Sequence, residues 1–209
     1  MKFISATASL SIITFVTTHA EERLPEVEIL HPGVRLSVVA EHPDIATPTG
    51  VDVDKDGQVW AVACHTHMPP KDYDGPTMDE ILIFEPDGTR RIFYDKTSQT
   101  MDLELGEDGW VYLAERDRIL RVRDSDGDGK GDVEETLVEL VSEAVYPHNA
   151  LSGLAWDPNG ELVFGLGENF AKAWDLNARD GSSIPGIDRG GVFRIRSEEG
   201  DHRQIAEGL

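Results

Sequence analysis

Gly50-Val-Asp-Val-Asp-Lys-Asp-Gly57-Gln-Val-Trp-Ala-Val62 decides the fold, because two later stretches repeat its pattern. The repeats are Asp102-Leu-Glu-Leu-Gly-Glu-Asp-Gly109-Trp-Val-Tyr-Leu-Ala114 and Gly153-Leu-Ala-Trp-Asp-Pro-Asn-Gly160-Glu-Leu-Val-Phe-Gly165, and the turn glycines lie 52 and 51 residues apart. Each stretch alternates apolar and polar residues, turns at Asp-Gly or Asn-Gly, and continues as a second strand. This pattern is typical of a β-hairpin with one buried face.

A second candidate hairpin follows each repeat. The paired segments are 81–84 with 90–94, 119–123 with 136–140, and 192–196 with 203–206. Two hairpins in about fifty residues make a four-stranded blade, and a fixed period of this size indicates a β-propeller. The alternative is a β-sandwich whose turns happen to be evenly spaced.

We therefore predict an all-β fold, a β-propeller of four-stranded blades at about 45–95, 97–141 and 148–207. Arg35 to Ala40 is a candidate additional outer strand. A closed ring needs about four to eight blades, so the domain at 21–209 is predicted to be incomplete, with about three blades present.

The first twenty residues have the pattern of a signal peptide. Lys2 precedes an apolar run from Phe3 to Val16, and small residues stand at the two cleavage positions of Thr18-His19-Ala20. The alternative, an uncleaved anchor, is disfavoured because the apolar run is short for a membrane span. We expect an exported protein, periplasmic or associated with the cell envelope, without membrane insertion after cleavage.

Charge and cysteine content narrow the function classes. The 209 residues include 40 acidic and 19 basic side chains, which give a formal charge of −21. Such a surface repels phosphate backbones and anionic lipids, so nucleic acid is excluded as an expected partner. Cys64 is the only cysteine, so no intrachain disulfide can form.

An acidic loop separates the two outer strands of the second blade. Asp124-Ser-Asp-Gly-Asp-Gly-Lys-Gly-Asp-Val-Glu-Glu135 places oxygen ligands at positions 1, 3, 5, 9 and 12 and glycine at position 6, which is the spacing of a calcium loop. Strand patterns rather than helix patterns flank it. The predicted ligands of a structural calcium ion are Asp124, Asp126, Asp128, the Lys130 carbonyl, Asp132 and Glu135; the alternative is a solvated acidic turn.

Blade connectivity sorts the remaining loops onto two ends. The calcium loop belongs with the tight turns, whereas 64–79, 142–152 and 168–190 belong to the opposite, long-loop end. Long loops on a rigid scaffold commonly carry function. The candidate catalytic residues there are His148, Glu168, His65 and His67, although each could instead make only a structural hydrogen bond.

The stretch from His148-Asn-Ala-Leu-Ser-Gly153 to Gly167-Glu-Asn169 resembles the corresponding region of soluble glucose/sorbosone dehydrogenases. Those are six-bladed propellers that use pyrroloquinoline quinone and calcium, and the resemblance implies that His148 accepts the substrate hydroxyl proton. Glu168 stands where those enzymes usually have aspartate. The residues that would hold the quinone lie in later blades, so its binding residues are unknown here.

Residues 30 to 209 also resemble the exported planctomycete and verrucomicrobial proteins described as membrane-bound dehydrogenases, in which such a propeller precedes a CxxCH cytochrome c domain. His65-Thr-His67, Phe164-Gly-Leu-Gly-Glu-Asn169 and Gly190-Gly-Val-Phe193 carry this resemblance. It implies a quinone-dependent oxidation of a sugar or polyol, with a cytochrome c domain as electron acceptor. The alternative is a non-catalytic propeller module that binds a glycan or a protein partner.

Overall fold

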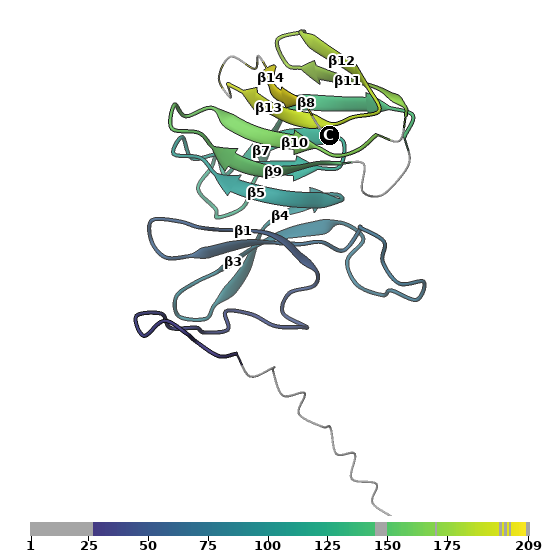
Figure 1. Cartoon of the computed structure of the whole chain (residues 1–209). Coiled ribbons are helices and arrows are strands. Elements are labelled where there is room, and N and C mark those ends of the chain that lie inside the picture. Colours follow the sequence, from purple (N-terminus) through teal and green to yellow (C-terminus); the bar gives the residue numbers. More distant parts are fainter. Residues whose placement is uncertain are drawn as a thin grey trace, which may run out of the picture. The chain divides into compact units, whose positions relative to one another are not determined.

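The computed structural model describes residues 27–144, 150–169, 171–196, 198, 200 and 202–207. The chain divides into two compact units, Met1–Ser37 and Val38–Leu209. In the first unit, the described residues contain one turn, in which the Val34 amide donates to the His31 carbonyl at 3.1 Å. The described part of the second unit contains fourteen β-strands and no helix (Figure 1). The described residues therefore include no helix that could cross a membrane. The predicted signal peptide lies outside them.

The first sheet contains four antiparallel strands in the order β1-β2-β3-β4. They are β1 (Pro48–Val53), β2 (Val59–Ala63), β3 (Asp79–Phe84) and β4 (Arg90–Thr97). The β1–β2 turn closes because the Asp54 carboxylate accepts the amides of Asp56 and Gln58, both at 2.9 Å. Gly57 completes it with a φ of 81°, which glycine adopts without strain.

The second sheet has six strands in the order β12-β11-β8-β7-β6-β5. They are β5 (Thr100–Leu105), β6 (Val111–Glu115), β7 (Arg118–Arg123), β8 (Val133–Ser142), β11 (Ala173–Ala178) and β12 (Ser183–Ile187). The third sheet has the order β14-β13-β10-β9. Its strands are β9 (Leu151–Trp156), β10 (Leu162–Leu166), β13 (Gly191–Ile195) and β14 (His202–Glu207).

The first strands of the three sheets lie next to one another, with β1 against β5 and β5 against β9 (Figure 1). Two carboxylates join them: Asp52 accepts the Leu105 amide at 2.9 Å, and Asp102 accepts the Leu154 amide at 2.8 Å. At Gly50 a Cβ would lie 2.7 Å from the Leu103 nitrogen, so only glycine allows β1 and β5 to approach this closely. Each repeat is thereby bonded to the next.

The hydrophobic core lies between sheets. One cluster combines Ile81 and Phe93 of the first sheet with Leu113 and Leu120 of the second. Another combines second-sheet residues such as Tyr112 with Phe164 and Phe193 of the third. Complete burial of a side chain such as Leu113, which is fully inaccessible to solvent, contributes about 2 kcal/mol.

The all-β prediction is confirmed, and each predicted hairpin segment overlaps an observed strand, although β13 ends one residue before the predicted segment 192–196. Two expectations were wrong. Arg35 to Ala40 forms no strand. The stretch 168–190, expected to be a long loop, contains the β11–β12 hairpin, which pairs with β8 of the second sheet because Trp174, Leu176 and Ala178 alternate onto a buried face.

Candidate functional site

The long-loop end of the first sheet is organised around one buried carboxylate, Asp79. Its oxygens accept the backbone amides of His65 at 2.6 Å, Thr66 at 2.8 Å and Thr100 at 2.8 Å. Asp79 is completely inaccessible to solvent, and these three donors replace the water that its charge has lost. Through Asp79, hydrogen bonds thus connect the loop that follows β2 to β3 and to the start of β5.

His65 lies directly beside this carboxylate and is itself buried, with 7% of its side chain exposed. Its Nδ1 forms a hydrogen bond with the Tyr73 hydroxyl, and its Nε2 lies 3.6 Å from a Glu80 oxygen. The Nε2 atom is buried and has no hydrogen-bond partner among the described residues. Both ring nitrogens face protein groups, so His65 is suited to supporting the loop rather than meeting a ligand directly.

A second buried carboxylate joins the first two sheets at the same end. Glu115 accepts the Thr97 hydroxyl at 2.6 Å and the Ser98 amide at 3.1 Å, and it pairs with Arg118 at 2.7 Å. Burial alone would lower the pKa of the Arg118 guanidinium, but hydrogen bonds and charge from Glu115 and Glu134 outweigh it and raise that pKa. Thr97 and Thr100 are themselves bonded hydroxyl to hydroxyl at 2.6 Å.

The third sheet brings the two ends of the stretch 150–169 together. The Gly167 amide donates to the Ala150 carbonyl at 3.2 Å, immediately beyond the Leu151–Leu166 pair. Glu168 is exposed at this end, whereas Asn169 is buried and its amide group donates to the Lys172 carbonyl at 2.9 Å. His148 lies outside the described residues.

The candidate catalytic residues therefore differ in burial and lie in different connections. His65 is buried and His67 is half-buried in the β2–β3 connection, and Glu168 is exposed in the β10–β11 connection. His65 is brought together with Asp79, Tyr73 and Glu80, which the sequence analysis did not single out. A signal for Asp79 was available, because two acidic residues, Asp79 and Glu80, open a strand at 79–84 whose other residues are apolar.

The acidic loop lies between β7 and β8, as expected. Asp124, Asp126 and Asp128 can each direct one oxygen to within 4.8 Å of the others, which is close enough for one cation. Asp124 also accepts the amides of Gly127 at 2.7 Å and Gly129 at 2.8 Å, and these backbone bonds, the Gly129 bond foremost, lower its pKa. Three of the predicted ligands are thereby gathered.

Asp132 and Glu135 point to other partners. Asp132 accepts both the amide and the hydroxyl of Ser125 at 2.7 Å, and Glu135 pairs with Arg121 at 2.7 Å and Arg179 at 2.6 Å. The backbone of the loop is bonded to β4, because the Gly129 carbonyl accepts Arg91 at 2.9 Å and the Gly131 amide donates to Phe93 at 2.7 Å. These last two bonds join the loop to the first sheet.

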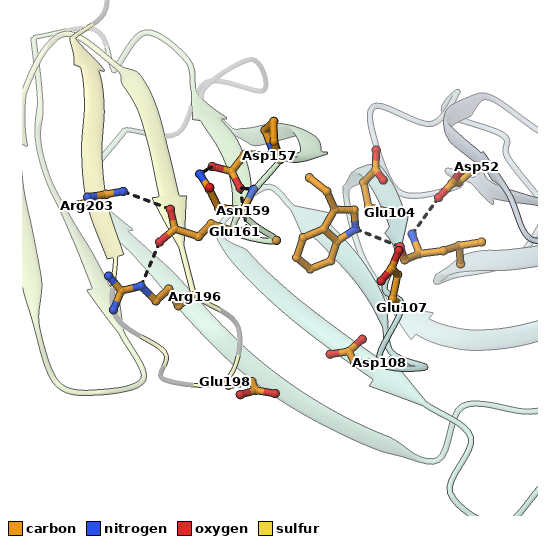
Figure 2. Close-up of a pocket in the computed structure, with 14 residues that line it drawn as sticks. Asp52, Glu104, Glu107, Asp108, Asp157, Asn159, Glu161, Arg196, Glu198 and Arg203 are labelled. Carbon is orange, nitrogen blue, oxygen red and sulfur yellow. Dashed lines mark hydrogen bonds and ion pairs between the residues drawn. The ribbon is translucent and has the colours of Figure 1, made fainter.

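The end of the strands opposite the long-loop end carries the tight turns and is called the turn end. It contains a cavity of about 930 Å³, which residues of all three sheets line (Figure 2). Glu104 of β5 forms part of its wall. Burial, followed by the negative charges of Asp52 and Asp102, raises the pKa of Glu104 to about 7. Sequence reasoning missed this cavity because its residues belong to turns and strand ends that looked purely structural.

A family model described as "Domain of unknown function (DUF7133)" matches residues 19–208. No curated protein matches the chain. Similar solved structures include a virginiamycin B lyase from Staphylococcus aureus, with 16% identity, a TM-score of 0.42, and coverage of 79% of this chain and 57% of that one. A gluconolactonase from Xanthomonas campestris has 17% identity, a TM-score of 0.49, and coverage of 73% and 51%.

A calcium-binding protein, regucalcin, from Agrobacterium tumefaciens has 16% identity, a TM-score of 0.49, and coverage of 82% of this chain and 46% of that one. The chain thus spans about half the length of these three solved structures.

Proposed function

The chain belongs to the family described as a domain of unknown function (DUF7133), and from that premise we propose that it is the propeller part of an exported dehydrogenase that oxidises a sugar or polyol hydroxyl. The observation that carries this proposal is the hydrogen bond from the Gly167 amide to the Ala150 carbonyl. It joins the two ends of the stretch that resembles the glucose/sorbosone dehydrogenases, with Glu168 next to the junction.

In this proposal the three sheets are successive propeller blades. The contacts of β1 with β5 and of β5 with β9 support it, because the innermost strands of neighbouring blades lie side by side around a propeller axis. The hydrogen bonds from Asp52 and Asp102 to the following sheet support the same arrangement. The β11–β12 hairpin would extend the second blade beyond its four strands.

Each candidate residue has a role in this proposal. His148 would accept the hydroxyl proton, since a neutral imidazole is suited to that transfer near neutral pH. Glu168 would lie at the mouth of the same site, and His67 would contribute to its wall. His65, with its ring directed at Tyr73 and Glu80, would position the loop and not touch the substrate.

Arg116 and Arg118, at the long-loop end, do not form a quinone site. Pyrroloquinoline quinone carries carboxylates and needs cationic partners. At the long-loop end, Arg116 donates to the Ala144 carbonyl at 2.9 Å, and Arg118 is bound by Glu115 and Glu134. The buried acidic groups at this end are the carboxylates of Asp79 and Glu115. Quinone dependence and a cytochrome c acceptor therefore enter only as part of the proposal, and no reaction step is derived through them.

We further propose that the acidic loop binds calcium as a structural ion. Asp124, Asp126, Asp128 and the Lys130 carbonyl would form the initial site, and the proximity of the three carboxylates supports it. Asp132 would become a further ligand of the ion by giving up its hydrogen bonds with Ser125. Glu135 would have to leave Arg121 and Arg179, so we expect it to remain with the arginines.

The test uses the native full-length protein, supplied with pyrroloquinoline quinone and calcium, and measures dye reduction with a panel of sugars and polyols. We expect turnover by the wild type, loss of that turnover in His148→Ala, and normal turnover in His31→Ala, which changes an exposed histidine of the first unit. Turnover that persists in His148→Ala would remove His148 from the reaction. No turnover with any substrate would contradict the dehydrogenase assignment, and sugar binding without dye reduction would favour the non-catalytic module.

A further inference from the structure

The turn-end cavity has a composition of its own. It lies beside Trp156 and Leu162, at the opposite end of the β9–β10 pair from Leu151 and Leu166. Its volume of about 930 Å³ falls within the range of about 300–1,000 Å³ that is usual for small-molecule sites. Figure 2 shows carboxylates of the first and second sheets on one side and an arginine–carboxylate cluster of the third sheet on the other.

The side of the cavity formed by the first and second sheets, the first wall, presents hydrogen-bond acceptors. Asp52 is held in place by the amides of Val53 at 2.7 Å and Leu105 at 2.9 Å. Glu104 and Glu107 stand beside it, and Glu104 makes no hydrogen bond to any described residue. Among the described residues, no three acidic groups of this cavity are close enough to share one ion, since the single such group is Asp124, Asp126 and Asp128. The described acceptors of this wall are therefore not arranged as a three-carboxylate cation site.

The side of the cavity formed by the third sheet, the second wall, presents hydrogen-bond donors that are held by a shared carboxylate. Glu161 accepts from Arg194 at 2.9 Å, Arg196 at 3.0 Å and Arg203 at 3.1 Å. The negative charge of Glu161 is thus compensated by three guanidinium groups, two of which, on Arg196 and Arg203, line the cavity. A ligand here meets donors and acceptors on facing walls.

An indole lies between the two walls. Trp156 lines the cavity, and its Nε1 donates to the Leu105 carbonyl at 3.0 Å, while the edge-to-face contact with Tyr112, at 4.9 Å between centroids, fixes the ring. A rigid aromatic surface flanked by planar carboxylate and guanidinium groups matches a molecule with apolar C–H faces and many hydroxyl groups.

We propose that this cavity binds a neutral polyhydroxylated ligand, a sugar or polyol, in a site separate from the one assigned to His148. The hydroxyl groups would donate to Glu104 and Asp52 and accept from Arg196 and Arg203, and the C–H face would cover Trp156. The unneutralised carboxylates of the first wall disfavour an anion. This site lies at the other end of the strands, so it goes beyond the proposed oxidation and does not depend on it.

The test is calorimetric titration of the chain with glucose, sorbitol and maltotriose, with putrescine and gluconate as cationic and anionic comparisons. We expect at least one neutral probe to bind. Glu104→Ala and Arg203→Ala should each weaken that binding about tenfold, the effect of one lost hydrogen bond to a charged group. The matched control is Asp56→Ala, because Asp56 is an exposed carboxylate at the same end that does not line the cavity.

Three results would overturn the inference: no binding of any neutral probe, tighter binding of putrescine or gluconate, or binding that Glu168→Ala weakens while both cavity variants retain it. The last result would assign the sugar to the long-loop end. Dye reduction by the full-length protein is a separate measurement, so its failure leaves the cavity proposal standing if sugar binding depends on Glu104 and Arg203.

Discussion

Replacing Glu104 with glutamine should stabilise the protein at alkaline pH and have a smaller effect at mildly acidic pH. Glu104 is half-buried, and its pKa is raised from 4.5 to about 7, first by burial and then by the charges of Asp52 and Asp102. As the pH rises above 4.5, the unfolded chain releases this proton while the folded chain still holds it. The free energy of unfolding therefore falls with pH until the folded pKa has been passed.

The size of the change in the free energy of unfolding follows from the difference between the folded and unfolded pKa values of Glu104. At about 1.36 kcal/mol for each pH unit, a rise from 4.5 to about 7 corresponds to at most about 3 kcal/mol. Glu104 is partly exposed, and water screens its charge, so we expect about 1–2 kcal/mol at pH 8.5. At pH 5.5 the folded group is still mostly protonated, and about 40% of the full effect should be present.

Urea denaturation of wild type and Glu104→Gln at pH 5.5 and pH 8.5 measures this difference. Both values avoid the isoelectric region near 4.5, where a chain without net charge precipitates. Glu107→Gln is the control, because Glu107 is exposed on the turn that follows β5. Equal stabilisation at the two pH values, or a variant less stable than wild type at pH 8.5, would refute the account of Glu104.

Three other changes test the structure. Asp79→Ala leaves the amides of His65, Thr66 and Thr100 buried without an acceptor, so we expect a loss of about 3–5 kcal/mol in urea denaturation; a loss below 1 kcal/mol would contradict the role of Asp79. Gly50→Ala places a Cβ 2.7 Å from the Leu103 nitrogen and should cost about 1–3 kcal/mol, whereas an unchanged midpoint would show that β1 and β5 can separate freely. Asp126→Ala and Asp128→Ala should each abolish calcium binding in calorimetry, while Glu135→Gln should retain it; unchanged affinity in the first two variants would identify the loop as a charged turn.

Much of the fold could be predicted because it depends on local patterns. The Asp-Gly and Asn-Gly turns at regular spacing, with alternating residues on both sides, predicted the first hairpin of each sheet, namely β1–β2, β5–β6 and β9–β10. The β11–β12 hairpin was missed for a different reason. Its alternation from Trp174 to Ala178 is local, but its pairing with β8 joins residues of two different repeats, and a long-range partner cannot be read from spacing.

The candidate site was less predictable, because it depends on which side chains meet after folding. The spacing of the acidic loop predicted that Asp124, Asp126 and Asp128 lie close together. They do, because one tight turn sets all three positions. The position of Glu135 depends on Arg179, 44 residues away, and that of His65 depends on Tyr73 and Glu80 across a loop. Such contacts involve tertiary packing that a linear pattern does not encode.

The acidic composition has a structural explanation that the charge alone concealed. Asp54, Asp87 and Asp157 each accept backbone amides within their own turns. Asp52 and Asp102 join neighbouring sheets, and Asp79 and Glu115 fasten the long-loop end. Many of these carboxylates therefore act as fixed acceptors for backbone amides that turns and close strand contacts would otherwise leave unbonded. A formal charge of −21 is consequently weak evidence for a cationic ligand. Glu104 differs from them because no described residue donates to it, and for that reason its carboxylate, rather than the overall charge, is the group to test for ligand binding.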